Sequence, residues 1–266
     1  MRKHSFIIIG IIIVCIILLC AIAAAAKASC KSIDEACAES VSYSTRTGWV
    51  PLPIIECSED NEIVRHEYYT LSYNETHEQP NWVWYVVTRS MVNGPAQRES
   101  AFMEDPLVST GSAVPADYKK SGFDRGHLCP AADMRLDNKC MKETFYMSNI
   151  SPQLHQFNAG IWLDLENYVR ELACRYDSLY VVTGPVLKDD LPCIKGKYNK
   201  ISVPEEFYKI IYSEKYGWMQ GYIIPHKTTY KNKKELFMYK VPVDSIESTT
   251  HIDFFRGVVD EDFLEQ

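Results

Sequence analysis

The chain has 266 residues, of which 46% are hydrophobic and 24% are charged, and its formal net charge at pH 7 is −7. This composition excludes an intrinsically disordered chain and a repetitive fibrous one, and it is typical of one ordinary globular domain. The acidic balance also argues against a broad electrostatic attraction to nucleic acid, which normally uses a basic face.

The N-terminus carries an apolar run, residues 6–26, directly after the basic residues Arg2 and Lys3. About 20 apolar residues are enough to span a bilayer as a helix. The run ends in small residues, and Ala26-Lys27-Ala28 fits the small-x-small pattern of a signal-peptidase site. Residues 1–28 are therefore interpreted as a signal peptide or an N-terminal membrane anchor. Both interpretations predict an exported chain that is periplasmic, secreted or membrane-anchored outside the cytoplasm.

Nine cysteines are present, and seven of them lie beyond residue 28. In the oxidising compartment that export predicts, most of these seven should form disulfides. Their positions favour two neighbouring pairs, Cys129 with Cys140 and Cys174 with Cys193. Zinc is the competing explanation, but the seven lack the C-x2–4-C spacing of structural zinc sites.

Beyond the N-terminal segment, residues 29–64 are expected to form an irregular, Cys-containing lead, and residues 65–266 one domain. No internal repeat or low-complexity linker divides this domain. Short runs of β-branched and aromatic residues predict that strands dominate it. The predicted strands cover residues 82–88, 179–183, 209–212, 221–224 and 236–241.

One long helix is predicted from Phe157 to Cys174, because apolar residues recur there at a spacing of three to four. This apolar face is expected to pack on the sheet. Residues four apart on a helix share a face, so a second stripe is formed by Asn158, Trp162, Glu166 and Arg170. A solvated face with an ion pair between Glu166 and Arg170 would produce the same pattern.

The stretch Asp124-Arg125-Gly126-His127 combines residue types that could cut a phosphodiester. Such hydrolysis needs a base to deprotonate water, a cation to neutralise the phosphate oxygens, and help for the leaving alkoxide. An imidazole is the side chain best suited to take a proton near neutral pH, and the glycine lets backbone and substrate approach closely. His127 is therefore the candidate base, whereas His155 is interpreted as structural.

This stretch resembles a motif of the DNA/RNA non-specific endonucleases. These are ββα-metal nucleases of the endonuclease G-like kind. The resemblance covers about residue 65 to the C-terminus. It is carried by Ser121-Gly122-Phe123-Asp124-Arg125-Gly126-His127-Leu128, Pro130-Ala131-Ala132-Asp133-Met134, Asn149-Ile150-Ser151-Pro152-Gln153, Asn158-Ala159-Gly160-Ile161-Trp162, Val182-Thr183-Gly184-Pro185 and Phe207-Tyr208-Lys209. It implies an α+β fold of the ββα-metal (His-Me finger) class, with a central, mainly antiparallel sheet flanked by helices.

The resemblance also implies roles for three residues in a metal-dependent hydrolysis. His127 matches the general base. Asn158 matches the single protein ligand of a Mg²⁺ ion, with Mn²⁺ or another divalent cation as alternatives. Glu166 matches a carboxylate that holds a water of that ion. One amide ligand suits Mg²⁺, which prefers oxygen ligands and keeps most of its waters.

Four further residues are implied to support the same chemistry. Arg125 and Arg170 match arginines near the scissile phosphate, and Asn149 matches a supporting amide. Arg98 is the best-placed match for one more arginine, although its alignment is looser.

The implied activity is hydrolysis of DNA and RNA, single- or double-stranded, without preference for sequence or sugar, to products with 5′-phosphates. Two other functions are left open: a catalytically inactive nucleic-acid or surface-binding protein on the same fold, and a phosphodiesterase for another exported substrate. A membrane is a partner only if the N-terminal segment is retained. The oligomeric state is open and includes a homodimer.

Two cysteines depart from the family pattern, because related chains often have small residues at the positions of Cys129 and Cys140. The paired change predicts a disulfide that braces the loop after His127. The alternative is two small buried thiols.

Overall fold

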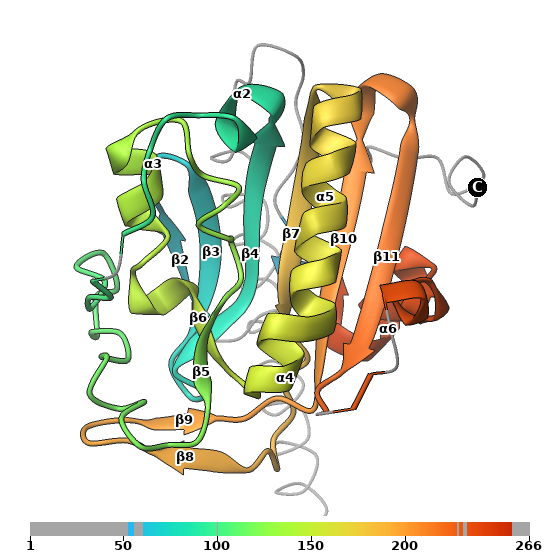
Figure 1. Ribbon diagram of the computed structural model, residues 1–266. Helices are drawn as coiled ribbons and strands as arrows, with labels where there is room; N and C mark the ends of the chain where they lie inside the picture. The colour runs from blue at the N-terminus through green and yellow to red at the C-terminus, as the bar shows by residue number, and fades with distance from the viewer. Residues whose placement is uncertain (1–52, 56–60, 100, 228, 231–232, 257–266) are drawn as a thin grey trace, which may run out of the picture. The chain divides into compact units, whose positions relative to one another are not determined.

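The computed structural model describes residues 53–55, 61–99, 101–227, 229–230 and 233–256. Within these residues, seven strands form a sheet in the order β12-β11-β10-β7-β4-β3-β2, and every neighbouring pair is antiparallel (Figure 1). These strands are β2 (Asn61–Arg65), β3 (Tyr69–Asn74), β4 (Gln79–Thr88), β7 (Ser178–Pro185), β10 (Glu206–Ser213), β11 (Trp218–Pro225) and β12 (Lys240–Val241). The predicted mainly antiparallel sheet is confirmed.

Three two-stranded ladders and several helices surround this sheet. The ladders pair β5 (Asp124–His127) with β6 (Ile150–Gln153), β8 (Cys193–Lys195) with β9 (Lys200–Ser202), and β1 (Ile54–Ile55) with β13 (Ile252–Asp253). The helices are α2 (Arg89–Val92), α3 (Asn138–Glu143), α4 (His155–Phe157), α5 (Leu163–Tyr176) and α6 (Val243–Thr250). Shorter helical turns are η1 (Met147–Asn149), η2 (Asn158–Trp162), η3 (Glu214–Tyr216) and η4 (Lys233–Tyr239).

The strands at the centre of the sheet are buried along most of their length because both of their faces are covered. On one face, α5 packs on β7 and β4 (Figure 1). On the other, Tyr208 and Tyr212 of β10 contact the rings of Phe254 and Phe255. Strands buried on both faces are apolar almost throughout. For this reason the runs at residues 82–88, 179–183, 209–212 and 221–224 were recognisable, and all four lie in strands.

Two short strands and a helix form the ββα unit. Strands β5 and β6 pair antiparallel, with Asp124 opposite Gln153 and His127 opposite Ile150, and the chain then enters α4, η2 and α5. A strand at Asp124–His127 was not predicted from the sequence. It was not recognisable because four polar or small residues show no apolar alternation. Gly126 is needed at this crossing, since a Cβ there would lie 2.2 Å from the Gln153 side chain.

The long predicted helix is present, but it is interrupted near its start. Asn158–Trp162 form a π-helical turn in which Gly160 has φ −111° and ψ −114°, and α5 then continues to Tyr176. A π-helical turn contains more residues than an α-helical one, so the four-residue spacing does not hold across it. Asn158 and Glu166 consequently do not share a simple helical stripe, and Trp162 is completely buried.

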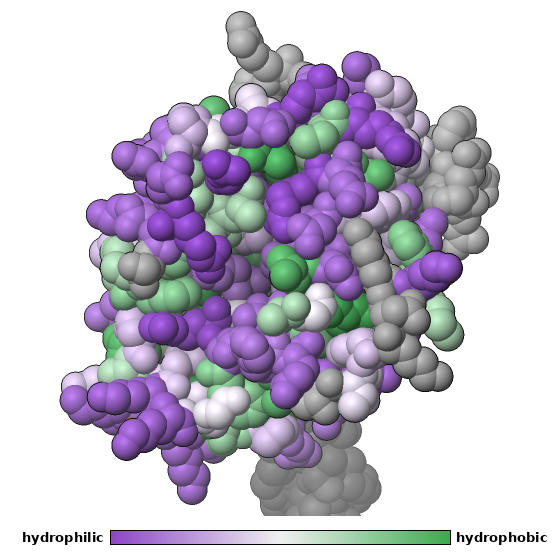
Figure 2. All heavy atoms as spheres, in the orientation of Figure 1, coloured by the Kyte–Doolittle hydropathy of each residue, from purple (hydrophilic) through white to green (hydrophobic). Residues whose placement is uncertain are grey.

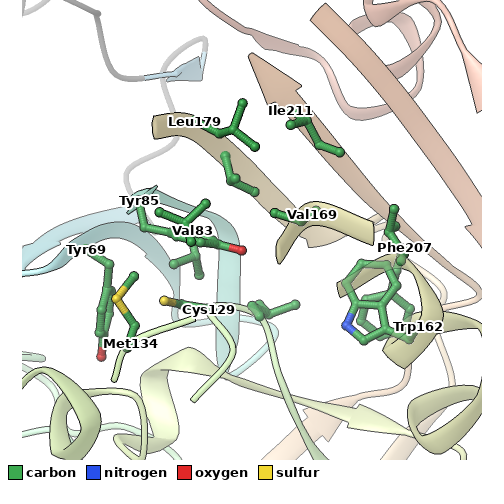
Figure 3. Packing of buried hydrophobic residues seen from close by; sticks show 14 of the residues in the cluster. Tyr69, Val83, Tyr85, Cys129, Met134, Trp162, Val169, Leu179, Phe207 and Ile211 are labelled. Atoms are coloured by element: carbon green, nitrogen blue, oxygen red, sulfur yellow. The ribbon is translucent and has the colours of Figure 1, made fainter. Parts of the chain in front are cut away.

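The core lies between α5 and the sheet (Figure 3). Val169 of α5 and Trp162 of the π-helical turn pack against Leu179, Phe207 and Ile211 of the strands, and all five side chains are buried. The apolar face of the predicted helix therefore packs on the sheet as expected.

The strand predicted at residues 236–241 is mostly wrong. Residues 233–239 form the helical turn η4, and only Lys240 and Val241 are in a strand. Leu236 is buried, whereas the next two residues, Phe237 and Met238, are 52% and 80% exposed. Leu236 and Tyr239, which meet the core, are three residues apart, whereas a strand would have buried alternate residues.

The predicted disulfides are also corrected, because Cys129, Cys140, Cys174 and Cys193 are all free thiols. Cys129 and Cys140 are completely buried in the core cluster, where the Sγ of Cys140 lies 3.5 Å from the Sδ of Met134. Figure 3 shows Cys129 among apolar side chains beside Met134. A buried thiol behaves as a small hydrophobic group, which is the alternative that the sequence left open.

The predicted N-terminal segment, residues 1–28, and Cys30, Cys37 and Cys57 lie outside the described residues. In the part of the chain that is described, no helix has the length and apolar character needed to cross a membrane.

Candidate active site

A pocket of about 550 Å³ opens beside β5 and the start of the π-helical turn. Residues from three separate parts of the chain meet there: the segment before β5, β5 itself, and the turn that precedes α5. The lining residues are Arg98, Phe102, Pro115, Tyr118, Lys119, Phe123, Asp124, Arg125 and Asn158. Three of the residues expected in a site, Arg98, Arg125 and Asn158, therefore line one cavity.

His127 lies at the end of β5, behind the aromatic wall of this pocket. Its side chain packs against Phe102, with ring centroids 5.3 Å apart, and against the edge of Phe145, at 5.0 Å. The residue is only 8% exposed, and its Nε2 is buried without a hydrogen-bond partner. Burial, together with the positive charges of Arg98 and Arg125, lowers the pKa of His127 to about 3. The imidazole is therefore neutral near pH 7, which is the form that can accept a proton.

Arg125 and Arg98 lie over the rings of Phe102 and Phe145, which also pack against His127. The guanidinium carbon of Arg125 lies 4.2 Å from the centre of the Phe102 ring, and that of Arg98 lies 5.4 Å from the centre of Phe145. Cations placed over aromatic faces are stabilised and oriented by the ring quadrupole. The result is a pair of positive charges beside a neutral base, an arrangement suited to a phosphate.

Asn158 contributes an amide whose orientation is set by Asp124. The Nδ2 of Asn158 donates to Asp124 Oδ2 at 3.0 Å, and the same oxygen lies 2.8 Å from Nδ1 of His155. Because the nitrogen end of the amide is bound to Asp124, its Oδ1 is the end that can bind a cation. His155 therefore contacts the same carboxylate that orients Asn158.

The donors around Asn158 fit a hard divalent cation. An amide oxygen with a carboxylate next to it is the ligand chemistry that Mg²⁺ or Mn²⁺ prefers. Among the described residues, no group of three or more His, Cys, Asp or Glu side chains is arranged to hold a metal ion. An ion held here would therefore take most of its ligands from water and phosphate, with Asn158 as its protein ligand.

Glu166 and Arg170 form a second charged layer on α5. Arg170 donates to Asp133 Oδ1 at 2.7 Å, and its Nη1 lies 4.0 Å from Glu166 Oε2. Burial and the nearby charge of Asp133 raise the pKa of Glu166, whereas Lys209, Arg170 and Arg98 oppose this rise. Both side chains are about nine-tenths buried, so the pair is not the solvated surface ion pair that the sequence left open.

Lys209 is a buried cation near Glu166 and Asp133 that was not among the site residues predicted from the sequence. It lies on β10 with its side chain completely buried, and its Nζ has no hydrogen-bond partner. The Nζ is 4.8 Å from the centre of the Trp162 ring. Burial lowers the pKa of Lys209, but the negative charges of Glu166 and Asp133 oppose this shift. A single lysine within the apolar run Phe207–Tyr212 was the signal, because a lysine is almost never fully buried without a charged partner.

Asn149 braces the loop that follows His127. Its amide accepts a hydrogen bond from the backbone nitrogen of Cys129 at 2.8 Å and donates to the carbonyls of Cys129 and Thr144, both at 2.9 Å. Asn149 is completely buried, so its contacts are within the fold and not with a ligand. The amide, and not a disulfide, crosslinks this loop.

Asn149→Ala is expected to lower the free energy of unfolding by about 2–5 kcal/mol, because it leaves buried backbone groups of Cys129 and Thr144 unpaired. Chemical denaturation monitored by circular dichroism measures this loss. Asn93→Ala is the control, since Asn93 is exposed and its side chain donates to the carbonyl of Arg89 and to the Sγ of Cys174. A loss below about 1 kcal/mol for Asn149→Ala would contradict the bracing role.

Comparisons with known proteins agree with this geometry. The sequence profile of the DNA/RNA non-specific endonuclease family matches residues 54–261. The chain belongs to this family. The fold and the resemblance predicted from the sequence are therefore confirmed.

Several related proteins match about three quarters of this chain. The chain is 33% identical over 212 residues to mitochondrial endonuclease G of Homo sapiens, covering 74% of this chain and 71% of the relative. It is 33% identical over 213 residues to nuclease C1 of Cunninghamella echinulata var. echinulata, covering 73% and 82%. A solved structure, that of the EndoG/EndoGI complex, has a TM-score of 0.68 and 31% identity and covers 76% of this chain and 88% of that one.

A further relative matches this chain over less than half of its own length. The chain is 38% identical over 158 residues to the mitochondrial nuclease EXOG of Danio rerio, which covers 55% of this chain and 46% of the relative. This chain thus matches about half the length of that protein.

The prediction of an exported protein is wrong. The relatives from Homo sapiens, Danio rerio and Saccharomyces cerevisiae are named mitochondrial nucleases. The N-terminal run misled the interpretation because an apolar segment behind basic residues inserts into membranes in general and does not specify which membrane. The expectation of disulfides depended on export, and the free thiols of the described cysteines agree with this correction.

Proposed function

We propose that this nuclease is a divalent-metal-dependent endonuclease that hydrolyses DNA and RNA without preference for sequence or sugar. The observation that carries the proposal is the meeting of a neutral His127 with the guanidinium groups of Arg98 and Arg125 beside one pocket that Asn158 also lines. His127 is proposed as the base, Asn158 as the metal ligand, and Mg²⁺ as the ion. The nuclease domain is proposed to extend from the start of the family match at residue 54 to the C-terminal region.

The residues divide the reaction between them. His127 takes a proton from the attacking water as its oxygen forms a bond to phosphorus, and the bond from phosphorus to the 3′-oxygen breaks, leaving a 5′-phosphate. Arg98 and Arg125 neutralise the charge that develops on the phosphate oxygens. A divalent ion held by Asn158 would add charge stabilisation at the phosphate and at the departing 3′-oxygen, which then takes a proton from water.

Binding of the substrate also adjusts the base. Burial, and after it the charges of Arg98 and Arg125, keep the pKa of His127 low in the free protein. A phosphate bound beside these arginines offsets their charge and so raises the pKa of His127 in part, whereas the lowering by burial remains. Since the arginines contact phosphate and not bases, little sequence specificity is expected.

Glu166, Arg170 and Asn149 are proposed to support this chemistry. Glu166, in its ionised form, would orient a water of the bound ion. Arg170 would keep Asp133 and Glu166 ionised, through its contacts of 2.7 Å with Asp133 and 4.0 Å with Glu166. Asn149 would hold the backbone after His127 in place.

The test uses the full chain with supercoiled plasmid DNA and with a folded RNA, each in Mg²⁺ and in EDTA. We expect cutting of both nucleic acids in Mg²⁺ only, and a loss of about 10²-fold or more for Asn158→Ala at low Mg²⁺, partly restored by raising Mg²⁺. Asn93→Ala, a change of the same kind at an exposed site, should cut like the parent. No metal-dependent cutting by the parent would refute the nuclease proposal and leave a binding protein on this fold.

A further inference from the structure

A cluster of exposed lysines lies on the β8–β9 hairpin. Residues 193–202 contain Lys195, Lys197 and Lys200 and no acidic residue, in a chain whose formal charge is −7. All three lysines are exposed, and Tyr198 at the turn is 67% exposed. The Nζ of Lys197 lies 4.8 Å from the centre of the Tyr198 ring. The hairpin therefore presents an aromatic face among positive charges.

Asp117 fixes this turn in place beside the segment that lines the pocket. Its Oδ1 accepts hydrogen bonds from the backbone nitrogens of Tyr198 at 2.7 Å and Asn199 at 3.2 Å, and its Oδ2 accepts one from the Asn199 side chain at 3.1 Å. The contact is close, since a Cβ at Gly196 would lie 2.5 Å from the Asp117 Cβ. Asp117 is only 2% exposed. The Asp117 carboxylate is therefore buried in its hydrogen bonds to the hairpin and does not repel a negatively charged ligand at the surface.

The segment that carries Asp117 joins the hairpin to the pocket. Lys119 and Lys120 follow Asp117 after the buried Tyr118 and are exposed, and Lys119 lines the pocket together with Arg98 and Arg125. Positively charged residues therefore lie at the pocket, on this segment and on the hairpin, with Asp124 at the pocket and Asp189 and Asp190 before the hairpin as exposed or partly exposed acidic neighbours.

The figures place this surface at one end of the molecule. In Figure 1 the β8–β9 hairpin lies below β5, and its tip is at the lower left. Figure 2 shows mostly hydrophilic residues in the same region of the surface. The tip of the hairpin thus lies in a hydrophilic part of this face, whereas apolar residues such as Phe102 and Phe123 also line the pocket.

We propose that Lys119, Lys120 and the β8–β9 hairpin form a docking platform for the single-stranded nucleic acid that flanks the scissile phosphate. The lysines contact phosphates of this strand, and Tyr198 stacks on one of its bases. The inference rests on the proposed nuclease function, which it deepens by naming a binding surface outside the catalytic pocket.

Single-stranded nucleic acid is the partner that these residues fit. Bases of a duplex are stacked on each other and cannot lie on the Tyr198 ring, whereas an unpaired base can. Stacking is independent of base identity, and lysine contacts to phosphate are independent of the sugar. A platform of this kind would let an acidic protein bind DNA and RNA through one local basic surface.

The first test measures binding by the full-length His127→Asn form with Mg²⁺, using fluorescence anisotropy of a labelled single-stranded oligonucleotide and of a duplex. Tyr198→Ala is expected to weaken binding of the single strand at least about 5-fold and to leave the duplex within 2-fold. The triple change K195Q/K197Q/K200Q should lower the slope of log Kd against log salt by about 2.

A matched control exists at the opposite end of the sheet. Tyr216 in the β10–β11 turn is 51% exposed, and Lys215 Nζ lies 5.3 Å from its ring centre. The pair K215Q/Y216A therefore removes a lysine and an exposed tyrosine, as K197Q/Y198A does, but at the end of the sheet opposite to β5 and the β8–β9 hairpin in Figure 1. Unchanged binding in K197Q/Y198A, or equal losses in both pairs, would overturn the platform. Thermal melting of each variant checks that the fold is intact.

The second test measures cleavage by variants that retain His127. For a long single strand, K197Q/Y198A should lower kcat/KM at least about 5-fold, whereas cleavage of a dinucleotide, which cannot reach the hairpin, should match the parent. An equal loss on both substrates would overturn the platform in favour of damage to the pocket. If the parent cuts neither substrate, the proposed function fails, and the binding measurement still decides the platform.

Discussion

His127→Asn is expected to lower kcat for plasmid cleavage by about 10²- to 10⁴-fold, which is the usual contribution of a general base. His127 is almost completely buried between Phe102 and Phe145, and its pKa is lowered to about 3 by burial and by Arg98 and Arg125. The imidazole is then neutral at every pH at which a nuclease is normally assayed. No other described histidine packs on the ring of Phe102 that lines the pocket.

Single-turnover cleavage measures this loss, and binding of the uncut plasmid by the variant shows that only the chemical step has changed. His251→Asn is the control, because His251 is exposed at the end of α6 with φ 57°, a conformation that asparagine also tolerates. Cleavage by His127→Asn at more than about one-tenth of the parent rate would contradict the assignment of the base.

Lys209→Met is expected to move the acid limb of kcat/KM to higher pH by about 1 unit. Because the pKa of His127 is far below its ordinary value while that of Glu166 is raised, the acid limb in the parent is expected to reflect ionisation of Glu166. Glu166 acts as a carboxylate, so activity is present above its pKa and is lost as the pH falls through it. Lys209 lowers this pKa, and removing the cation raises it. At a pH on the acid limb the variant should therefore be slower by up to about 10-fold and should recover as the pH rises.

The measurement is a pH profile of kcat/KM for the parent, Lys209→Met and Glu166→Gln. Glu166→Gln should be slow and should lack this limb, because the amide does not ionise. Lys142→Met serves as the control, since Lys142 is an exposed lysine of α3. A merely structural lysine would reduce activity equally at all pH values, so a lower plateau with an unmoved limb would refute the electrostatic role of Lys209.

The strands that the sequence predicted well are those buried on both faces. Residues 82–88 and 179–183 lie at the centre of the sheet, and their continuous apolar runs follow directly from that position. Strand β5 was not recognisable, because Asp124–His127 has no apolar pattern and is held by pairing with β6. The run at 236–241 was misread because its apolar residues Phe237 and Met238 face solvent.

The sequence by itself determined the family and predicted the reactive side chains. His127, Asn158, Glu166, Arg125 and Arg170 were assigned by matching this sequence to the motifs of the family that it resembles. The family profile, which matches residues 54–261, agrees with that reading.

Only the tertiary structure decided the state of those side chains. The pKa of His127 depends on burial and on Arg98, and the pKa of Glu166 depends on Asp133 and Lys209, all from other parts of the chain. Burial and charge act through space, so linear spacing does not report them. The same reason explains why Cys129 is a buried thiol in the core, and why a hairpin that is remote in the sequence lies beside the pocket through the contact of Asp117 with Tyr198.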